Sequence, residues 1–508
     1  MVSIYAILAL AFVVYLLFKK TFRKDLPPGP PALPLLGNAH QFIVGRLQGK
    51  SNVDVMREWK ALYGSVYTMW LGPMPVVIVC DYKTAMDVFV RNGEDHAGRA
   101  SAFVFQKARE NLGLVFTDGP AWQEHRRFAL FTLRNFGLGR NIMQQRILEE
   151  IKYRFEALDR EIDDSKRGYV EINPTYFLDL LISSVINKLI AGYRYDDSNI
   201  EEFRNLKHSL DITMDILTPL DMILFNNYTY DLPLFRKRWA ATTKPQFDII
   251  NLMRKQIADR RQAIASGQHH LDMELGGDDY IDAFFIEMEK RKQNGEDLGF
   301  FKDEYLAANV MDLWIAGTET TISSLLWCFI YILNDAPIQE KLRVEFHRIT
   351  NGNREIELTD KSSMPYTNAV ITESLRCGNV LNFNLLHRTT CKTVVGDYVI
   401  PENVSITPQV SVIMTEEKEF ANPNKFDPDR YIKNKNLEKQ MIPFGIGKRS
   451  CLGERLARAE MFLILSNFLQ RYKISIPEGC DPPSMEQISL ESMIRRARPY
   501  KMRVEKAH

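Results

Sequence analysis

The sequence predicts a mainly helical protein of the α+β class with small β-sheets, for three reasons. Apolar residues recur at three- and four-residue steps, the helical pattern, from Tyr82 to about residue 375. Runs with β character are short, and they occur at 66–82, at 393–400 and in the last thirty residues. The chain has 508 residues, of which 45% are hydrophobic, so it can bury a large core.

Charge and cysteine content argue against several function classes. Lys and Arg number 65 and Asp and Glu 64, and this balance gives no reason to expect a nucleic-acid partner. The six cysteines lie far apart and none forms a CxxC pair, which argues against a zinc ribbon or an iron–sulfur cluster. No disulfide framework is suggested, so we expect the body of the protein to face a reducing compartment.

The N-terminus, residues 1–24, predicts a signal-anchor transmembrane helix. Residues 2–18 are apolar and uncharged, and a basic stop follows at Lys19, Lys20, Arg23 and Lys24. A cleavable signal carries its positive charges before the apolar run, whereas this order leaves a short N-terminus in the lumen and the rest in the cytosol. Seventeen residues is the short end of a membrane span, and a buried N-terminal helix is the alternative.

Two further segments bear on the membrane. Residues 25–40 form a Pro-rich hinge whose core, LPPGPP, is stiff, so we expect it to space the catalytic domain, residues 41–508, from the bilayer. Later in the chain an apolar group allows two interpretations, a surface that dips into the membrane or ordinary core packing. Its members are Ile223, Leu224, Phe225, Leu232 and Leu234.

A hairpin and a long apolar helix are predicted from local patterns. The runs VYTMWL and VVIVCDY are split by Gly72-Pro73-Met74-Pro75, which predicts a β-hairpin. Residues 306–333 form the longest internal apolar helix, but its densest run, 325–333, is too short to cross a bilayer and Glu319 interrupts the larger segment. We therefore expect a buried helix at this place.

The stretch FGIGKRSCLG, residues 444–453, carries the most specific chemistry. It presents Cys451 between glycines in a loop, directly before a helical pattern over 454–468. Glycines let the backbone approach a bulky group, and N–H groups at a helix entrance can stabilise a thiolate. A thiolate held in this way is a good axial ligand for haem iron. An ordinary buried cysteine beside a turn is the alternative.

Three other patterns fit a haem pocket. Trp122 and Arg126 lie four residues apart on one helical face, where an N–H and a guanidinium suit two anionic propionates, although an ordinary amphipathic helix explains them too. Small residues at the centre of the long helix, AGTETT over 316–321, would let a flat macrocycle lie against it, and Gly317 would weaken the helix locally. Glu373 and Arg376 pair at three residues' spacing, which at a surface contributes only ~0.3–0.5 kcal/mol.

Together these patterns resemble the cytochrome P-450 superfamily of haem-thiolate monooxygenases, in particular its microsomal, family-two-like animal members. The cysteine loop matches the superfamily pattern FxxGxRxCxG at all five fixed positions, which here are Phe444, Gly447, Arg449, Cys451 and Gly453. Four further motifs follow the family's order, covering about residue 26 to 472. They are WxxxR at 122–126, the oxygen-activation motif at 316–321, ExxR at 373–376, and FxPxRF, closed here by Tyr, at 426–431.

The resemblance implies a triangular helical haem-thiolate monooxygenase fold that binds haem b, with Cys451 as axial thiolate. The other implied haem contacts are Arg449, Trp122, Arg126, Arg99, His387, Phe444 and Gly445. Thr320 and Glu319 would serve oxygen activation and proton delivery, and a buried triad of Glu373, Arg376 and Arg430 would brace the cysteine loop. We expect an apolar substrate pocket lined by Phe103, Phe105, Leu112, Leu114, Phe116, Leu313, Ala316 and Leu385. Asn382 and Leu386 stand where related members have prolines, which puts substrate shape by analogy in doubt.

The implied activity is insertion of one oxygen atom from O₂ into a lipophilic molecule, by hydroxylation or epoxidation of a fatty acid, a steroid or a foreign compound. The chain shows no dinucleotide or flavin fingerprint, so electrons must come from a partner. By resemblance this is a membrane NADPH-dependent flavoprotein reductase, with cytochrome b5 as a second candidate, at the endoplasmic reticulum. The reductase would dock on basic residues, namely Arg127, Arg134, Lys448, Arg455 and Arg458. The alternative is that these residues are ordinary solvated helix surface.

Two other functions remain to be distinguished. A haem-thiolate isomerase or dehydratase would rearrange lipid hydroperoxides without O₂ or a reductase, although retention of Glu319 and Thr320 argues against it. A membrane haem sensor or carrier would show no substrate-stimulated NADPH consumption.

Overall fold

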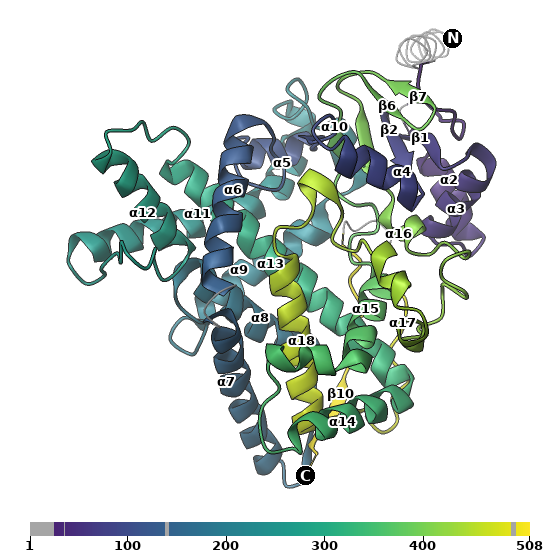
Figure 1. Ribbon diagram of the computed structural model, residues 1–508. Coiled ribbons are helices and arrows are strands. Elements are labelled where there is room, and N and C mark those ends of the chain that lie inside the picture. Colours follow the sequence, from purple (N-terminus) through teal and green to yellow (C-terminus); the bar gives the residue numbers. More distant parts are fainter. Residues whose placement is uncertain (1–24, 35, 138–141, 489–493, 508) are drawn as a thin grey trace.

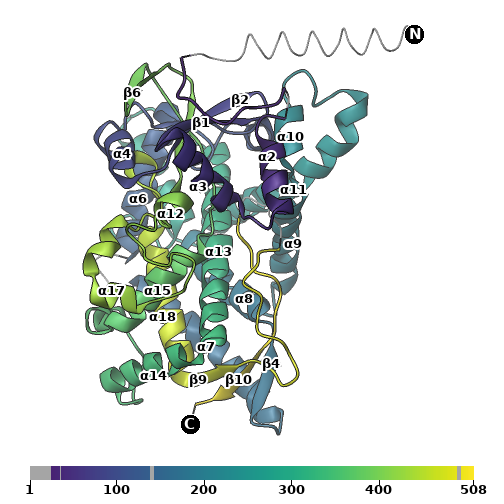
Figure 2. The ribbon, with the colours of Figure 1, turned by 90° about the vertical axis from the view of Figure 1, so that its right-hand side faces the viewer.

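The computed structural model describes residues 25–34, 36–137, 142–488 and 494–507 (Figure 1). Helices make up most of the described chain, and its outline narrows from a broad end to the C-terminus at the opposite end. Two of the small sheets lie at the broad end, and the third lies beside the C-terminus (Figures 1 and 2). The predicted mainly α architecture with small sheets is confirmed. The predicted anchor, residues 1–24, lies outside the described residues.

The helices are named as in Figure 1. The first group is α2 (Ala39–Leu47), α3 (Asn52–Tyr63), α4 (Tyr82–Met86), α5 (Phe103–Ala108), α6 (Gly119–Gly137), α7 (Ile142–Asp164), α8 (Pro174–Ala191), α9 (Ile200–Ile216), α10 (Pro219–Leu224) and α11 (Pro233–Ala265). The second group is α12 (Tyr280–Gln293), α13 (Asp303–Asn334), α14 (Ala336–Thr350), α15 (Pro365–Gly378), α16 (Val410–Ile413), α17 (Asp429–Lys433) and α18 (Glu454–Arg471). A π-helical turn spans Asp87–Arg91, and 3₁₀ turns span Leu358–Ser363, Lys435–Gln440 and Gly447–Arg449.

The strands form three small sheets. The five-stranded sheet has the order β1-β2-β8-β5-β3, the second sheet has the order β4-β10-β9, and β6 pairs with β7. All neighbours are antiparallel except β2 and β8. The strands are β1 (Val66–Leu71), β2 (Met74–Val79), β3 (Gly98–Arg99), β4 (Tyr169–Ile172), β5 (His387–Arg388), β6 (Thr393–Val395), β7 (Tyr398–Ile400), β8 (Ser405–Pro408), β9 (Tyr472–Ser475) and β10 (Met502–Lys506).

The predicted hairpin is confirmed as β1 and β2. Leu71 pairs with Met74 across the turn, and Gly72 takes a positive φ of 59° there, a conformation that glycine adopts without steric cost. The β8–β5–β3 side of this sheet is built from residues almost three hundred positions apart, because Arg99 pairs with His387. The sheet therefore brings two predicted haem contacts next to each other.

Helix α13 is the centre of the main core. By length and composition it is the one helix in the described ranges that passes as a membrane span, yet 78% of its most apolar window is buried inside the protein. Figures 1 and 2 both show α13 beside α18, with α8 and α15 packed close by. The expectation of a buried helix at 306–333 is confirmed, and the observed helix extends a few residues further at its N-terminus.

The Pro-rich segment is docked on the body rather than free. The carbonyl of Pro28 accepts a hydrogen bond from the Thr68 N–H at 3.0 Å, and the Asn38 side chain bonds the carbonyls of Pro30 and Pro31. A Cβ at Gly29 would overlap the Thr68 carbonyl oxygen. Residues 26–31 thus lie along β1, and their role as a spacer from the bilayer stays a prediction.

The apolar group near residue 230 divides between the core and the surface. Phe225 is 2% exposed and packs on Trp239, with ring centres 5.1 Å apart, whereas Leu234 is 82% exposed and Leu232 is 45% exposed. Leu224 is half-buried, and the side chain of Ile223 lies outside the described part of the structure. Core packing therefore holds for Phe225, and membrane contact by the exposed leucines stays a prediction.

Candidate active site

The loop of residues 444–453, which we call the Cys451 loop, presents a thiol at the entrance of α18. Gly445 and Gly447 take positive φ values of 69° and 74°, and a Cβ at Gly447 would overlap the Phe89 carbonyl oxygen. The Cys451 N–H donates to the Phe444 carbonyl at 2.8 Å, which closes the loop. Gly447 is therefore required by close backbone approach, and Gly445 is favoured by its positive φ. The Cys451 side chain stays solvent-accessible, although protein atoms surround it on most sides.

The electrostatics around the thiol suit a ligand that must be deprotonated. Burial and the Glu454 carboxylate raise the pKa of the Cys451 thiol, whereas the N–H groups of Gly453 and Glu454 and the Arg126 guanidinium lower it. A metal ion removes the proton from a coordinating thiol outright, and these same donors then stabilise the thiolate. The predicted use of helix-entrance N–H groups stays a prediction, and the direction in which these groups shift the Cys451 pKa supports it.

Beside the loop lies a cation cluster, which we define as Arg99, Arg126 and Arg449 together with the Trp122 ring. The Arg449 guanidinium carbon sits 3.4 Å from the centre of the Trp122 ring, and its Nε donates to the Ala97 carbonyl at 2.7 Å. Arg126 donates to the Ser450 carbonyl at 2.5 Å. Arg99 donates through Nη1 to the carbonyls of Leu385 and Leu386.

Several donors in this cluster have no partner. Both terminal nitrogens of Arg449, Nε of Arg99 and Nε1 of Trp122 are buried without a hydrogen-bond acceptor among the described residues. Burial and then the Arg99 charge lower the pKa of Arg449 to about 8, and burial and then Arg126 lower the pKa of Arg99 to about 10. Buried cations that repel one another in this way require an anion with several acceptor oxygens. Two propionates of a porphyrin fit this donor set.

His387 adjoins the cluster on β5. Its Nδ1 lies 3.0 Å from the His96 carbonyl, and burial, followed by the Arg99 charge, holds the pKa of His387 well below its usual range. The neutral ring packs edge-on to Phe89, which also lies under Gly447. His387 therefore touches the same support as the Cys451 loop, although it was predicted from a different part of the sequence.

One face of α13 is open, and we call it the α13 face. Ala316 is exposed, and Leu313, Gly317 and Thr320 are half-buried, although most neighbouring residues of the helix are fully buried. The Thr320 hydroxyl donates to the Ala316 carbonyl at 2.6 Å. Gly317 does not weaken the helix as expected, because the helix is continuous. A Cβ at Gly317 would come within 2.8 Å of the Ile186 side chain on α8, so this glycine serves helix packing.

Glu319 lies in an ion-pair network away from the Thr320 hydroxyl. Its oxygens meet Lys207 Nζ at 3.0 Å and Arg496 Nε at 3.1 Å, and the side chain is 3% exposed. Within the described residues no hydrogen bond joins Glu319 to Thr320. Lys207 and Arg496 were not predicted, because nothing in the local sequence marks them.

A second unpredicted feature is a buried clamp between α13 and the segment after α5. Asp312 accepts hydrogen bonds from Arg109 Nε at 3.1 Å and from the N–H groups of Leu114 and Val115 at 2.8 and 2.9 Å. Arg109 also donates to Gln246 at 2.8 Å. The clamp fixes the backbone at Leu114, a predicted pocket residue, and its carboxylate neutralises the charge of Arg109.

The predicted pocket residues fall into different environments. Phe105 stacks on Phe116 at 4.4 Å, and Phe103 packs on Tyr230 and Trp239. Leu114 belongs to the main core at 8% exposure. The half-buried positions are Leu112, Phe116, Leu313 and Leu385.

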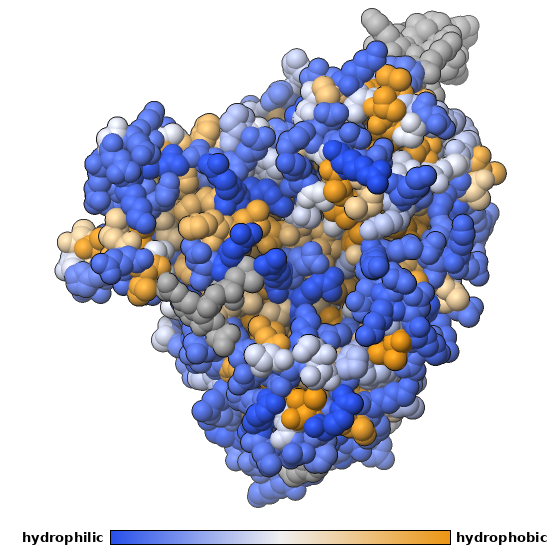
Figure 3. All heavy atoms as spheres, viewed as in Figure 1, coloured by the Kyte–Doolittle hydropathy of each residue, from blue (hydrophilic) through white to orange (hydrophobic). Residues whose placement is uncertain are grey.

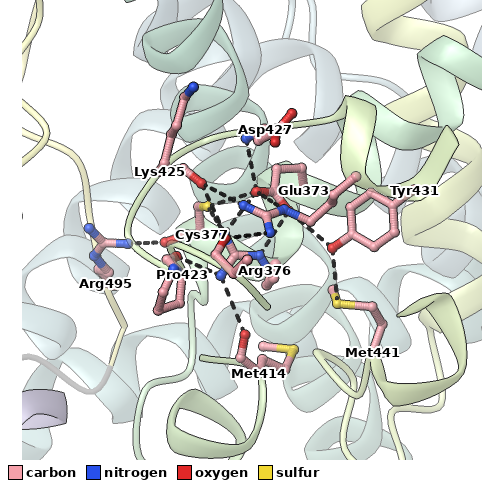
Figure 4. Close-up of polar contacts among 12 residues, drawn as sticks. Glu373, Arg376, Cys377, Met414, Pro423, Lys425, Asp427, Tyr431, Met441 and Arg495 are labelled. Carbon is pink, nitrogen blue, oxygen red and sulfur yellow. Dashed lines mark hydrogen bonds and ion pairs between the residues drawn. The ribbon is translucent and has the colours of Figure 1, made fainter. Parts of the chain in front are cut away.

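Glu373, Arg376 and Arg430 form the predicted buried cluster, which we call the carboxylate cluster (Figure 4). Arg376 binds Glu373 through Nε and Nη2, both at 2.8 Å, and Arg430 Nε binds it at 3.1 Å. The Glu373 and Arg376 side chains are fully buried, so the pair is no ordinary surface ion pair. The structure brings these three residues together from α15 and α17.

Comparison with known proteins agrees with this geometry. The family model described as Cytochrome P450 matches residues 27–504 of the chain. The chain belongs to the cytochrome P450 family. Among its relatives, "Probable cytochrome P450 cyp-35D1" of Caenorhabditis elegans is 34% identical over 470 residues, which is 92% of each chain. "Cytochrome P450 2C26" of Mesocricetus auratus is 32% identical, also over 92% of each chain, and "Cytochrome P450 2C8" of Homo sapiens is 32% identical over 89% of this chain and 88% of its own.

Family membership fixes the coarse chemistry. The protein is a haem-thiolate monooxygenase, and its cofactor is haem b with an axial cysteine thiolate. The cation cluster gives this assignment an independent physical basis, since its unpartnered donors match the charge and the acceptors of the cofactor.

Proposed function

We propose that this protein is a membrane-anchored monooxygenase of the endoplasmic reticulum that uses Cys451 as the haem ligand and oxidises neutral lipophilic molecules. The observation that carries the proposal is the pairing of an accessible thiol at a helix entrance with four buried, unpartnered donors beside it. No other cysteine in the described ranges lies beside such a cluster.

The bound haem supplies the activation of O₂ and the oxidising step. The protein's own residues bind and orient it. Arg449, Arg99 and Trp122 would hold the two propionates through the donors that lack a partner. Arg126 would help, while its bond to the Ser450 carbonyl keeps it beside the Cys451 loop.

Proton delivery is the role we propose for Thr320 and Glu319. The Thr320 hydroxyl lies on the α13 face and donates its proton to the backbone carbonyl of Ala316. It can release this intrahelical hydrogen bond and donate to a ligand instead. Glu319, paired with Lys207 and Arg496, would supply protons through water rather than by direct contact.

The substrate we propose is apolar and uncharged. The segment after β3 carries Phe103, Phe105 and Phe116. The Arg109 guanidinium, which lies over the Phe105 and Phe116 rings, is neutralised by Asp312. A carboxylate substrate would have to break that buried pair, which is costly. Hydroxylation or epoxidation of a steroid, a neutral lipid or a foreign compound fits this better than oxidation of an ionised fatty acid.

Electrons would come from an NADPH-dependent flavoprotein reductase, with cytochrome b5 as a second donor. Arg127, Arg134 and Arg455 are exposed and have no acidic partner among the residues described, whereas Lys448 pairs with Glu94 and Arg458 with Glu454. Phe131, 62% exposed, lies on α6 between the first two. An apolar centre with a basic rim suits an acidic docking face.

Membrane attachment would use the predicted single-pass anchor and an apolar surface of the catalytic domain, which would face the cytosol. In both ribbon views α2, α10 and the start of α11 lie at the broad end (Figure 2). Figure 3 shows orange atoms at this end, over the β6–β7 hairpin, where Val394 and Val399 pair and are both about half exposed. Other exposed apolar residues here are Ile43, Val44, Leu47, Leu220, Tyr228, Leu232 and Leu234.

Reconstitution tests the proposal. The full chain in phospholipid vesicles with an NADPH-dependent reductase should show NADPH and O₂ consumption that rises when a neutral lipophilic substrate is added. Turnover of a lipid hydroperoxide that persists without NADPH and O₂ would instead identify an isomerase or dehydratase. Haem binding without any substrate-stimulated NADPH consumption would identify a sensor or carrier.

A further inference from the structure

Tyr431 stands at the closing position of the FxPxRF-like segment, where the motif has phenylalanine, so its hydroxyl is an added polar atom. The residue lies on α17, is 2% exposed and packs with Ala369, Phe420 and Leu437. Its hydroxyl is 3.0 Å from Glu373 Oε2 and 3.3 Å from Met441 Sδ (Figure 4). A buried hydroxyl placed on a buried carboxylate needs a physical account.

The hydroxyl completes the hydrogen bonding of Glu373. Oε1 accepts from Arg376 Nη2, from Arg430 Nε and from the Asp427 N–H at 3.0 Å. Oε2 accepts from two donors in the described part of the chain, Arg376 Nε and the Tyr431 hydroxyl. Each carboxylate oxygen offers about two acceptor sites, so removal of the hydroxyl would leave one site of a buried charge empty.

The hydroxyl is a donor to the carboxylate at any ordinary pH. Burial, reinforced by the negative charge of Glu373, raises the pKa of Tyr431, so the group stays protonated. A hydroxyl has one proton, and it goes to the carboxylate because a charged acceptor is stronger than a thioether. The Met441 sulfur then packs against the hydroxyl oxygen.

Tyr431 contacts a different segment of the chain from the one that Arg376 and Arg430 bind. Arg376 binds the carbonyls of Met414 and Pro423, and Arg430 binds those of Ala421 and Lys425, so both hold residues 414–425. Tyr431 touches Met441, three residues before Phe444, whose carbonyl accepts the Cys451 N–H. It is the member of the cluster that contacts the chain entering the Cys451 loop.

We propose that Tyr431 is a fourth member of the carboxylate cluster and a positioning residue for Cys451, which ties Glu373 to the chain entering the Cys451 loop and so retains the thiolate on the haem iron. This inference rests on the proposed role of Cys451. Loss of the hydroxyl should loosen the entry of the loop and let the sulfur leave the metal, while the fold survives.

The test compares two Tyr→Phe variants of the haem-loaded protein. The carbon monoxide complex of the reduced protein has a Soret band whose position reports the axial thiolate, and its decay is followed in mild denaturant. Tyr431→Phe should lose this band about tenfold faster than the wild type, the effect of one hydrogen bond to a charged group. Tyr472→Phe is the matched control, because the Tyr472 hydroxyl is buried and bonds the Asp159 carboxylate at 2.8 Å, at the far end of α18.

The control variant should lower the thermal unfolding midpoint about as much as Tyr431→Phe but should leave the decay of the thiolate band unchanged. Equal decay in Tyr431→Phe and wild type would overturn the inference, and so would equal acceleration in both variants, since that is a purely structural effect. A wild-type protein without the thiolate band would contradict the proposed function itself, which separates the two failures.

Discussion

The two sides of the candidate site satisfy their polar groups in different ways. On the side of Cys451, the cation cluster keeps four buried donors without a protein acceptor, and the carboxylate cluster behind the loop is closed on itself. On the α13 side, Thr320 bonds within its own helix, and Glu319, which is buried off the open face, is bound to Lys207 and Arg496. One side thus requires a fixed anionic group, and the other is complete without one.

This difference separates the binding of the cofactor on the Cys451 side from the admission of substrate at the α13 face. Unpartnered buried cations are costly, so the Cys451 side is specific for one cofactor. The α13 face offers small and apolar side chains, which exclude charged ligands but choose poorly among neutral ones. Changes on the Cys451 side should therefore cost cofactor, and changes on the α13 face should cost turnover.

The largest effect should come from Glu373→Gln. The exchange leaves two buried guanidinium groups without their charged partner, which costs about 3–5 kcal/mol. We expect little or no haem-loaded protein, measured as moles of haem per mole of chain. Asp248→Asn, which breaks the exposed pair with Lys244, is the control and should load normally. Normal loading of Glu373→Gln would show that the carboxylate cluster does not support the loop.

Thr320→Ala tests the α13 face and should lower turnover without lowering haem content. Haem content should be unchanged, because the Thr320 hydroxyl bonds only its own helix. Product formed per NADPH consumed should fall by about 100-fold, the low end of the contribution of a positioned proton donor. Thr318→Ala is the matched control, since that hydroxyl makes the same bond to Trp314 but is buried away from the face. Equal coupling in both variants would remove Thr320 from proton delivery.

A buried histidine on α6, the helix that carries Trp122 and Arg126, should make the folded protein less stable at acidic pH. Burial lowers the pKa of His125 to about 4, and its Nε2 bonds the Phe300 carbonyl at 3.1 Å. Between pH 6.5 and 4 the unfolded chain takes up a proton that the folded chain refuses, so stability falls as pH falls. From pH 7 to 5 this loss should be about 2 kcal/mol, and His125→Phe should abolish it in denaturant unfolding. An unchanged pH slope in the variant would contradict a neutral His125.

The smallest effect should appear at the docking surface. Arg134→Ala should raise the KM for the reductase about fivefold at low salt, with kcat unchanged, because rim charges act mainly on encounter. The difference should shrink as ionic strength rises. Lys244→Ala on α11 is the control and should leave KM unchanged. A lower kcat, or an effect that salt does not reduce, would argue against electrostatic docking.

The Cys451 side was predictable because its signal is local. FxxGxRxCxG and WxxxR put Cys451, Arg449, Trp122 and Arg126 at fixed spacings, and the structure brings them together. The hairpin and α13 were likewise predicted from period and turn residues.

The α13 side was less predictable because its partners are remote in sequence. Lys207 lies 112 residues from Glu319, and Arg109 lies 203 residues from Asp312, so no local pattern links them. Gly317 illustrates the same limit, because a glycine is needed at this position to avoid a clash with Ile186 on another helix. Tyr431 was visible only as a departure from the motif, and its partners Glu373 and Met441 explain it.

Replacement of the cysteine tests the central claim most directly. The reduced protein is mixed with carbon monoxide, and the difference spectrum is recorded for wild type, Cys451→Ser and Cys480→Ser, in which an exposed cysteine is the control. The characteristic thiolate Soret shift should appear in the wild type and in Cys480→Ser and should be absent from Cys451→Ser. Survival of that shift in Cys451→Ser would mean that another side chain holds the iron, and the account of the Cys451 loop would fail.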